Sequence, residues 1–168
     1  MRVRMSRKAG RGKSLPVLLD STYLLPIFGV GVKEIDTETL TMLRSLALGR
    51  HVELYYSPIS LLEITAKIAR ETEKMGNGLS PEEVEYTIKI LEEAEYIKPV
   101  KPDARIYSFA YRMRLLGHRD MIDNILYATA TIKDLVFLTL DSRLRMFVQK
   151  QKLQGARIRN HQELMRYL

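Results

Sequence analysis

The stretch LVFLTL at residues 135–140 restricts the possible folds more than any other feature. Its six residues include no charged side chain, and only one of them carries a hydroxyl group. An uninterrupted apolar strand has to be covered on both faces, which is typical of a strand inside a parallel sheet. Residues 120–132 before it and residues 142–152 after it have the length and apolar spacing of helices. A strand between two helices is the repeating unit of an α/β protein.

The rest of the chain repeats this alternation. We predict strands at 16–19, 51–57, 96–102 and 156–158, and helices at 37–49, 60–74, 81–94, 104–116 and from Asn160 onward. The helix at 81–94 has the clearest start, because Ser80 can cap it, Pro81 fits its first position and Glu83 can complete a capping box. The fold class expected is therefore α/β, with a mostly parallel sheet and right-handed crossovers.

Four carboxylates fall on one predicted edge of this sheet. Asp20 and Asp141 end the first strand and the LVFLTL strand, whereas Glu63 and Asp123 lie in the first turns of helices. The helix that starts near Asp123 runs about 15 Å away from this edge, and the LVFLTL strand runs about 20 Å back toward it. Asp141 is therefore expected at the same edge as Asp123. Open parallel sheets bind ligands at this carboxyl edge.

Two interpretations of these acids stay open. Asp20 and Asp141 could cap the helices that follow them, Glu63 could form a capping box with Ser60, and Asp123 could favour a helix N-terminus. Alternatively, the acids share a divalent cation, since two carboxylates 4 Å apart repel by about 4 kcal/mol at an effective dielectric constant of 20. Oxygen ligands without cysteine or clustered histidine favour Mg²⁺ or Mn²⁺ over Zn²⁺.

Positive charge is concentrated at the two ends of the chain. Residues 1–13 hold six basic and no acidic residues, residues 142–168 hold seven basic and one acidic, and the stretch between them holds 14 basic and 19 acidic. Such asymmetry indicates a polyanionic partner, and RNA contacts are predicted at Arg143 and Arg145. We expect residues 1–14 to form a basic flexible arm and residues 15–168 to form one domain.

The composition indicates the cellular compartment of the protein. The chain has 168 residues and no cysteine, which is long enough for a core without disulfides and compatible with a reducing compartment. We find no apolar run of membrane-spanning length, and the basic N-terminus lacks the apolar stretch of a secretory signal. The sequence predicts a cytoplasmic protein without a membrane partner.

Four segments together give the chain a family resemblance. They are VLLDST with Asp20, SPISLLEI with Glu63, DNILYATA with Asp123 and LVFLTLD with Asp141. In this order and spacing, they resemble the PIN-domain ribonucleases, and in particular the VapC-type endonucleases of toxin–antitoxin modules, over about residues 15–160. The basic arm departs from the family pattern, as does RDMIDN, which offers Asp120 beside Asp123.

The resemblance implies a three-layer α/β/α fold with strand order 3-2-1-4-5, and hydrolysis of RNA phosphodiester bonds with one or two Mg²⁺ or Mn²⁺ ions. It implies that Asp20, Asp123 and Asp141 bind metal, and that Glu63 binds metal or positions the attacking water. A cognate antitoxin and a homodimer are implied partners. The predicted neighbours of the acids are Ser21, Asp120 and Thr139.

Other functions would require other residues or leave the acids without a catalytic role. A phosphatase with an aspartyl nucleophile would need a second aspartate two residues after Asp20, where Thr22 stands. A non-catalytic PIN-like module that binds RNA or protein, and a nuclease of RNA maturation, both stay open. We expect His118, which follows Gly117 in a predicted loop, to be solvated and to have no catalytic role.

Overall fold

The computed structural model describes residues 14–76, 78–153 and 155–168, so residues 1–13 of the predicted arm lie outside the described residues. Its five strands form one parallel sheet in the order β3-β2-β1-β4-β5, which confirms the predicted class and strand order. The strands are β1 (Leu15–Leu19), β2 (Val52–Tyr56), β3 (Ile97–Pro99), β4 (Val136–Leu138) and β5 (Ile158–Arg159). β3 and β4 are shorter than predicted.

The helices begin close to the predicted positions. They are α1 (Ser21–Leu24), α2 (Thr37–Leu48), α3 (Ser60–Met75), α4 (Pro81–Glu93), α5 (Ala104–Leu115), α6 (Met121–Ile132), α7 (Ser142–Lys150) and α8 (His161–Tyr167). The capping box predicted for α4 forms between Ser80 and Glu83. A 3-10 turn, η1 (Leu25–Phe28), was not predicted, and it starts where Pro26 interrupts the helix that α1 begins.

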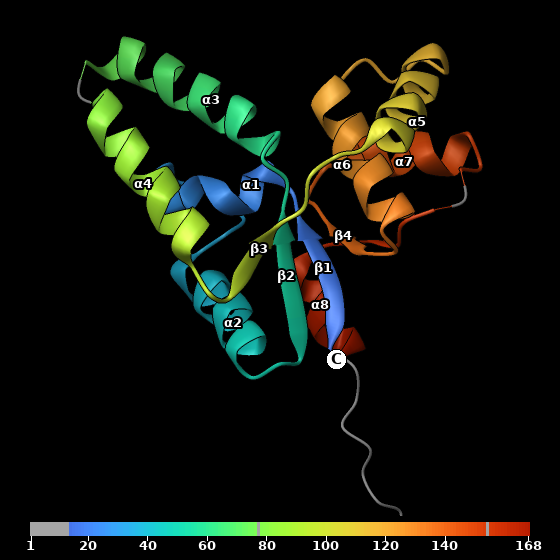
Figure 1. Cartoon of the computed structure of the whole chain (residues 1–168), viewed down its shortest axis with the longest axis horizontal. Coiled ribbons are helices and arrows are strands. Elements are labelled where there is room, and N and C mark those ends of the chain that lie inside the picture. The colour runs from blue at the N-terminus through green and yellow to red at the C-terminus, as the bar shows by residue number, and fades with distance from the viewer. Residues whose placement is uncertain (1–13, 77, 154) are drawn as a thin grey trace, which may run out of the picture.

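Side chains of β1 alternate between the two faces of the sheet and so separate two layers of helices. Val17 and Leu19 pack in a core with residues of α1, α2, α3, α4 and α8. Leu18 points the other way, into a core with Met113 of α5, Leu126 of α6 and residues of α7. Figure 1 shows the two groups of helices on either side of the strands. The fold is therefore the three-layer α/β/α arrangement.

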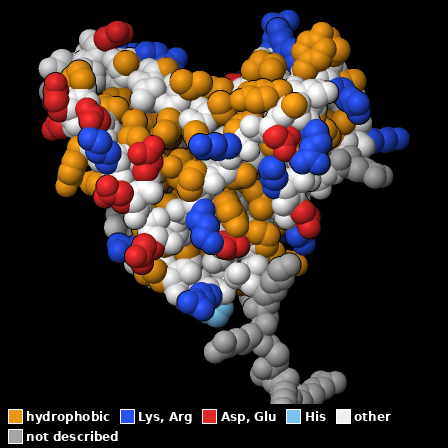
Figure 2. Space-filling model, viewed as in Figure 1, with side chains coloured by type: hydrophobic (Ala, Val, Ile, Leu, Met, Phe, Trp, Pro, Cys, Tyr) orange, Lys and Arg blue, Asp and Glu red, His pale blue; other side chains and the backbone are white. Residues whose placement is uncertain are grey.

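The turn from α6 to β4 brings the chain back to the edge where α6 began. Asp134 takes up the left-handed conformation at φ 53°, and the N–H of Leu135 donates to the carbonyl of Ala130 at 2.8 Å. β1 and β2 run toward an indentation between the α3–α4 hairpin and the α5–α7 helices (Figures 1 and 2). Among the described helices, none combines the length and apolar character that crossing a membrane requires.

Candidate acidic site

Asp20 lies at the centre of the sheet edge and is almost completely buried. Its backbone N–H donates to the carbonyl of Leu138 at 3.0 Å, so β1 and β4 hold it in place. It stands at the first position before α1, yet its side chain makes no capping hydrogen bond. Only 5% of the residue is exposed. The capping interpretation of Asp20 is therefore wrong.

Hydroxyl groups surround the Asp20 carboxylate instead. Thr139 donates to its Oδ2 at 2.7 Å, and Ser21 Oγ lies 3.2 Å from its Oδ1. Thr139 Oγ1 also accepts the backbone N–H of Asp141 at 3.0 Å. Ser21 and Thr139 are buried, so the structure places both predicted neighbours against this acid. Thr139 links two of the acids predicted to bind metal.

Burial and charge oppose the ionisation of Asp20. Desolvation is the main cause that raises the pKa of Asp20, and the negative charge of Glu63 raises it further. The hydrogen bond from Thr139 acts in the opposite direction, because it stabilises the charged form. A nearby cation would favour the ionised carboxylate.

Glu63 comes to the same edge from the first turn of α3. The capping interpretation of Glu63 is wrong, because Ser60 is already inside the helix and Ile59 precedes it without a side-chain cap. Glu63 Oε2 instead accepts a short hydrogen bond from Ser21 Oγ. Its Oε1 pairs with Lys67 Nζ at 2.7 Å. The prediction missed Lys67, although its position four residues after Glu63 was a usable signal.

The start of α6 contributes two further acids. Asp120 caps the helix, because its Oδ1 accepts the backbone N–H groups of Ile122 at 2.9 Å and Asp123 at 3.2 Å. Asp123 lies in the first turn and is half-buried. Capping by Asp120 therefore fixes the turn that carries Asp123.

The loop before α6 is anchored by a histidine. His118 Nδ1 lies 2.7 Å from Asn124 Oδ1, and Asn124 Nδ2 donates to the carbonyl of His118 at 3.0 Å. Asn124 is fully buried, and the imidazole packs on Phe147 of α7 with ring centroids 4.9 Å apart. The expectation that His118 is solvated was wrong, because these contacts hold it in the fold.

Asp123 experiences the negative charge of all the other acids. Burial is the first cause of its raised pKa, and the charges of Asp120, Asp20, Asp141 and Glu63 follow in that order; together they raise the pKa of Asp123 to about 8. Each of these groups is therefore near enough to Asp123 to oppose its negative charge. Near neutral pH, Asp123 holds a proton unless a cation compensates its charge.

Asp141 combines capping with proximity to the other acids. Its Oδ1 accepts the N–H groups of Arg143 at 2.7 Å and Leu144 at 3.1 Å, so the capping interpretation is right for this residue. Both bonds use the same oxygen. A capping role therefore leaves the second carboxylate oxygen available to a cation.

The side chains do not form a closed cage for a metal. Within residues 14–76, 78–153 and 155–168, no three histidine, cysteine, aspartate or glutamate side chains are grouped so that they could hold a metal ion. Shared metal binding by Asp20, Asp123 and Asp141 thus stays a prediction. The donors available at the edge are carboxylate and hydroxyl oxygens, which suit Mg²⁺ or Mn²⁺.

The two arginines predicted to contact RNA differ in their surroundings. Arg143 is exposed, whereas Arg145 forms two hydrogen bonds of 2.8 Å with Glu163 of α8. Arg145 is the main cause that lowers the pKa of Glu163 to about 2, and the backbone N–H of Asn160 adds to the shift. The guanidinium of Arg145 is therefore paired with a carboxylate of the same chain.

Comparisons with known proteins agree on the fold. The family model described as PIN domain matches residues 17–148. Two similar solved structures are DNA-bound VapBC from Salmonella typhimurium (17% identity, TM-score 0.58) and promoter-bound VapBC2 from Rickettsia felis (10% identity, TM-score 0.57). The first alignment covers 88% of this chain and the second 87%, and each covers 98% of the other chain.

A third similar structure is VapC20 of Mycobacterium tuberculosis, described as a toxin that cleaves the sarcin–ricin loop. It is 12% identical, with a TM-score of 0.55, over 85% of this chain and 98% of the other. At these identities the likeness concerns the fold alone. Among curated protein sequences, none matches the chain significantly.

Proposed function

This chain belongs to the PIN domain family, and we propose that it is a nuclease that cuts RNA with the help of Mg²⁺ or Mn²⁺. The observation that carries the proposal is the placement of the four acids of the family pattern, which follow two neighbouring parallel strands or begin two helices at the same sheet edge. Burial and the charges of the other acids raise the pKa of Asp123 there. A fold keeps such repulsion at a cost in stability. Charge of this kind is typical of a site that receives a cation.

The oxygen donors at the edge are of the kind that a divalent cation prefers, although the described side chains are not yet grouped around one position. Asp20, Asp123 and Asp141 would hold it, because they offer hard oxygen donors and the chain has no cysteine. A bound cation would lower the pKa of a water molecule and neutralise charge on the attacked phosphate. Thr139 would orient Asp20, since its hydroxyl contacts both that carboxylate and the N–H of Asp141.

Glu63 has a different role in this proposal. Its two oxygens contact Ser21 and Lys67, so it is oriented from both sides. A carboxylate held in this way can accept a hydrogen bond from the attacking water and take up its proton. Water would then add to phosphorus as the phosphodiester oxygen leaves, and that oxygen gains a proton from solvent.

RNA as substrate and an antitoxin as partner are the finer parts of the proposal. The proteins of similar fold include one described as a sarcin–ricin loop cleaving toxin and two described as DNA-bound VapBC or VapBC2. We propose a cytoplasmic toxin of such a pair. A nuclease of RNA maturation uses the same chemistry, and RNA sequencing after controlled expression separates the two by the transcripts that are cut.

A homodimer is also proposed, on the basis of exposed apolar side chains. Tyr107, Tyr111 and Leu115 follow one another at four-residue intervals on α5, and each is at least 46% exposed. Leu62 on α3 is 64% exposed. Apolar stripes of this kind are typical of interfaces. Light scattering of Tyr111→Arg should give a monomer mass if the stripe joins two copies.

The test of the activity is the replacement Asp123→Asn. It preserves size and the helix context but removes one negative charge, and we expect metal-dependent RNA cleavage to fall at least about 100-fold. The assay compares a mixed RNA pool with Mg²⁺, with Mn²⁺ and with EDTA. Asp134→Asn is the matched control, because Asp134 is exposed at the far end of α6 and asparagine tolerates its left-handed backbone.

Each outcome has a clear meaning. Cleavage by the wild type that survives EDTA, or equal cleavage by both variants, would contradict the proposal. RNA binding without cleavage by any variant would favour the non-catalytic module.

A further inference from the structure

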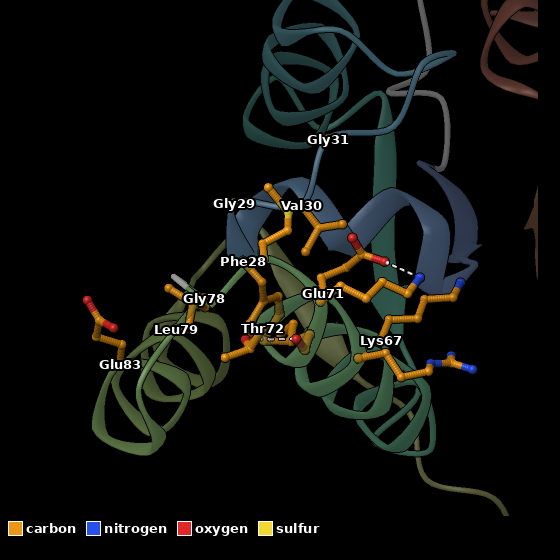
Figure 3. Close-up of a pocket in the computed structure, with 14 residues that line it drawn as sticks. Phe28, Gly29, Val30, Gly31, Lys67, Glu71, Thr72, Gly78, Leu79 and Glu83 are labelled. Carbon is orange, nitrogen blue, oxygen red and sulfur yellow. Dashed lines mark hydrogen bonds and ion pairs between the residues drawn. The ribbon is translucent and has the colours of Figure 1, made fainter.

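A groove of about 910 Å³ lies along α3 and adjoins the acidic site. Its walls are α3, the start of α4 and the loop after η1, and Figure 3 shows Lys67 at one end with Gly78 and Leu79 at the other. The Lys67 ammonium contacts Glu63 Oε1 at 2.7 Å, so this end of the groove meets the acids. Because α3 follows β2 and leads away from the sheet (Figure 1), the groove continues the acidic edge outward.

Three basic side chains of α3 line one wall of the groove. Lys67, Arg70 and Lys74 are spaced by three and four residues, so they lie on one face of the helix. The rise of an α-helix puts about 10 Å between the first and the last of them. Phosphates of a stacked strand follow one another at about 3.4 Å along its axis, so the row is about three nucleotides long.

The three charges differ in how strongly they are already paired. Lys67 is 33% exposed and is held by Glu63. Lys74 reaches Glu71 only at 3.4 Å, and both side chains are exposed, so water weakens this pair. Arg70 is exposed, and in the part of the chain that the structure describes no carboxylate forms an ion pair with it. Arg70 and Lys74 can therefore neutralise the negative charge of a ligand.

The other walls of the groove are apolar and leave room for a ligand. Phe28, Ile68 and Leu79 contribute apolar side chains to the lining. A Cβ added at Gly29 or at Gly31, in the loop after η1, would meet no atom within 4 Å. A row of cations beside an apolar surface suits a nucleotide strand, because the cations bind its phosphates and the apolar surface packs against its bases.

We propose that this groove binds the part of an RNA strand that continues from the acidic edge, on one side of the bond that is cut. This inference rests on the proposed function. Lys67 contacts the phosphate nearest the edge, and Arg70 and Lys74 contact the phosphates that follow. An acidic peptide could use the same cations, but the continuity of the groove with the acidic edge favours the strand that is cut there.

The test is the binding of fluorescein-labelled oligouridylate to the full-length protein, measured by anisotropy at several salt concentrations in EDTA, which removes divalent metal from the assay. The slope of log K against log salt should become shallower by about 0.7 in Arg70→Met and in Lys74→Met, and by about 1.4 in the double variant. Lys89→Met is the matched control, because Lys89 lies on α4 outside the groove and pairs with Glu85. Its slope should equal that of the wild type.

Two further variants change the groove without removing a cation. Glu71→Gln frees Lys74 from its weak pair, so the affinity for oligouridylate should rise, whereas Glu85→Gln on α4 should not change it. Gly31→Leu adds a side chain to the wall of the groove and should lower the affinity. Gly31 does not have a left-handed backbone, so leucine fits there without strain and the free energy of unfolding should stay the same.

Three results would overturn the inference. The first is a wild-type slope in both Arg70→Met and Lys74→Met. The second is an equal change of slope in Lys89→Met, because the effect would then come from net charge alone. The third is tighter binding of oligoglutamate than of oligouridylate by the wild type, which would assign the groove to a protein partner.

The cleavage assay with Asp123→Asn separates this inference from the proposed function. If the wild type cleaves RNA but the groove variants keep its salt slope, the proposed function stands and the groove does not bind the strand. If the slopes change as expected but no variant cleaves RNA, the groove binds RNA and the nuclease proposal is wrong.

Discussion

The acidic edge and the contact between α7 and α8 both hold partly buried charges, but only the second pairs each charge with its opposite. At the edge, burial and four carboxylates raise the pKa of Asp123 to about 8. Between the helices, Arg145 lowers the pKa of Glu163 to about 2. The charged form of a carboxylate is thus destabilised by other carboxylates at the edge and stabilised by an arginine between the helices.

The difference indicates what each region is for. A paired charge such as Arg145 with Glu163 contributes to the fold in every condition near neutral pH. In the part of the chain that the structure describes, no ion pair reaches the edge acids apart from the one between Lys67 and Glu63. Strongly perturbed carboxylates in a cluster are more typical of functional sites than of structural ones. Removing a charge should therefore lower the free energy of unfolding at the α7–α8 contact and raise it at the acidic edge.

The largest effect on stability is expected from Thr139→Val. Valine keeps the shape of the side chain but removes the donor to buried Asp20 and the acceptor of the Asp141 N–H. Two buried polar groups lose a partner, so the free energy of unfolding should fall by about 2 kcal/mol in urea titrations. Thr139→Ser keeps the hydroxyl and should lose less than half as much. Equal losses in both variants would mean that packing, rather than hydrogen bonding, causes the loss in the free energy of unfolding.

Arg145→Ala should have the next largest effect. The pair is bidentate and each side chain is 31% exposed, so we expect a loss of about 1 to 2 kcal/mol at pH 7 after allowing for screening by water. Because the pKa of Glu163 is lowered from 4.5 to about 2, its stabilisation is complete above pH 4.5 and declines as the pH falls toward 2. The difference between wild type and variant should shrink over that interval in urea unfolding. If the difference in the free energy of unfolding does not depend on pH, Arg145 stabilises the fold by something other than its attraction to the charge of Glu163.

At the acidic edge the sign should reverse. Asp123→Asn removes a repelled charge, so the free energy of unfolding of the metal-free protein should rise near pH 8. Since the pKa of Asp123 is raised from 3.8 to about 8, the wild type loses stability as the pH rises between these values. The gain of the variant should therefore be near zero below pH 4 and grow with pH. Thermal unfolding in EDTA measures it, and a gain at pH 4 equal to that at pH 8 would contradict the charge explanation.

Much of the fold could be predicted from local patterns. The apolar run at 135–140 indicated a covered strand, and Ser80 with Glu83 indicated the start of α4. The strand order came from the family resemblance, because strand patterns alone do not say which strands are neighbours. The four acids could be assigned to one edge, since the end of a parallel strand and the start of the next helix meet there.

Which atoms pair across long stretches of the chain could not be predicted in the same way. Ser21 and Glu63 are 42 residues apart, and Arg145 and Glu163 are 18 apart, so only the folded chain brings them together. Which acid caps a helix was also undecided, because a capping position does not fix the side chain. Asp141 caps α7, whereas Asp20 stands at the same kind of position and bonds with hydroxyl groups instead.

The smallest effect on stability, and the sharpest contrast within one helix, is expected from Arg143→Ala. Arg143 is exposed, so its loss should change the free energy of unfolding by less than about 0.5 kcal/mol. If Arg143 contacts an RNA phosphate, the slope of log K against log salt should become shallower by about 0.7, the value for one contact with a single strand. Arg145→Ala should leave that slope unchanged, because its guanidinium already binds Glu163. Fluorescence anisotropy with labelled RNA at several salt concentrations measures both slopes. A slope that changes for Arg145 and not for Arg143 would mean that the ion pair opens when RNA binds, and that the α7–α8 contact also serves the substrate.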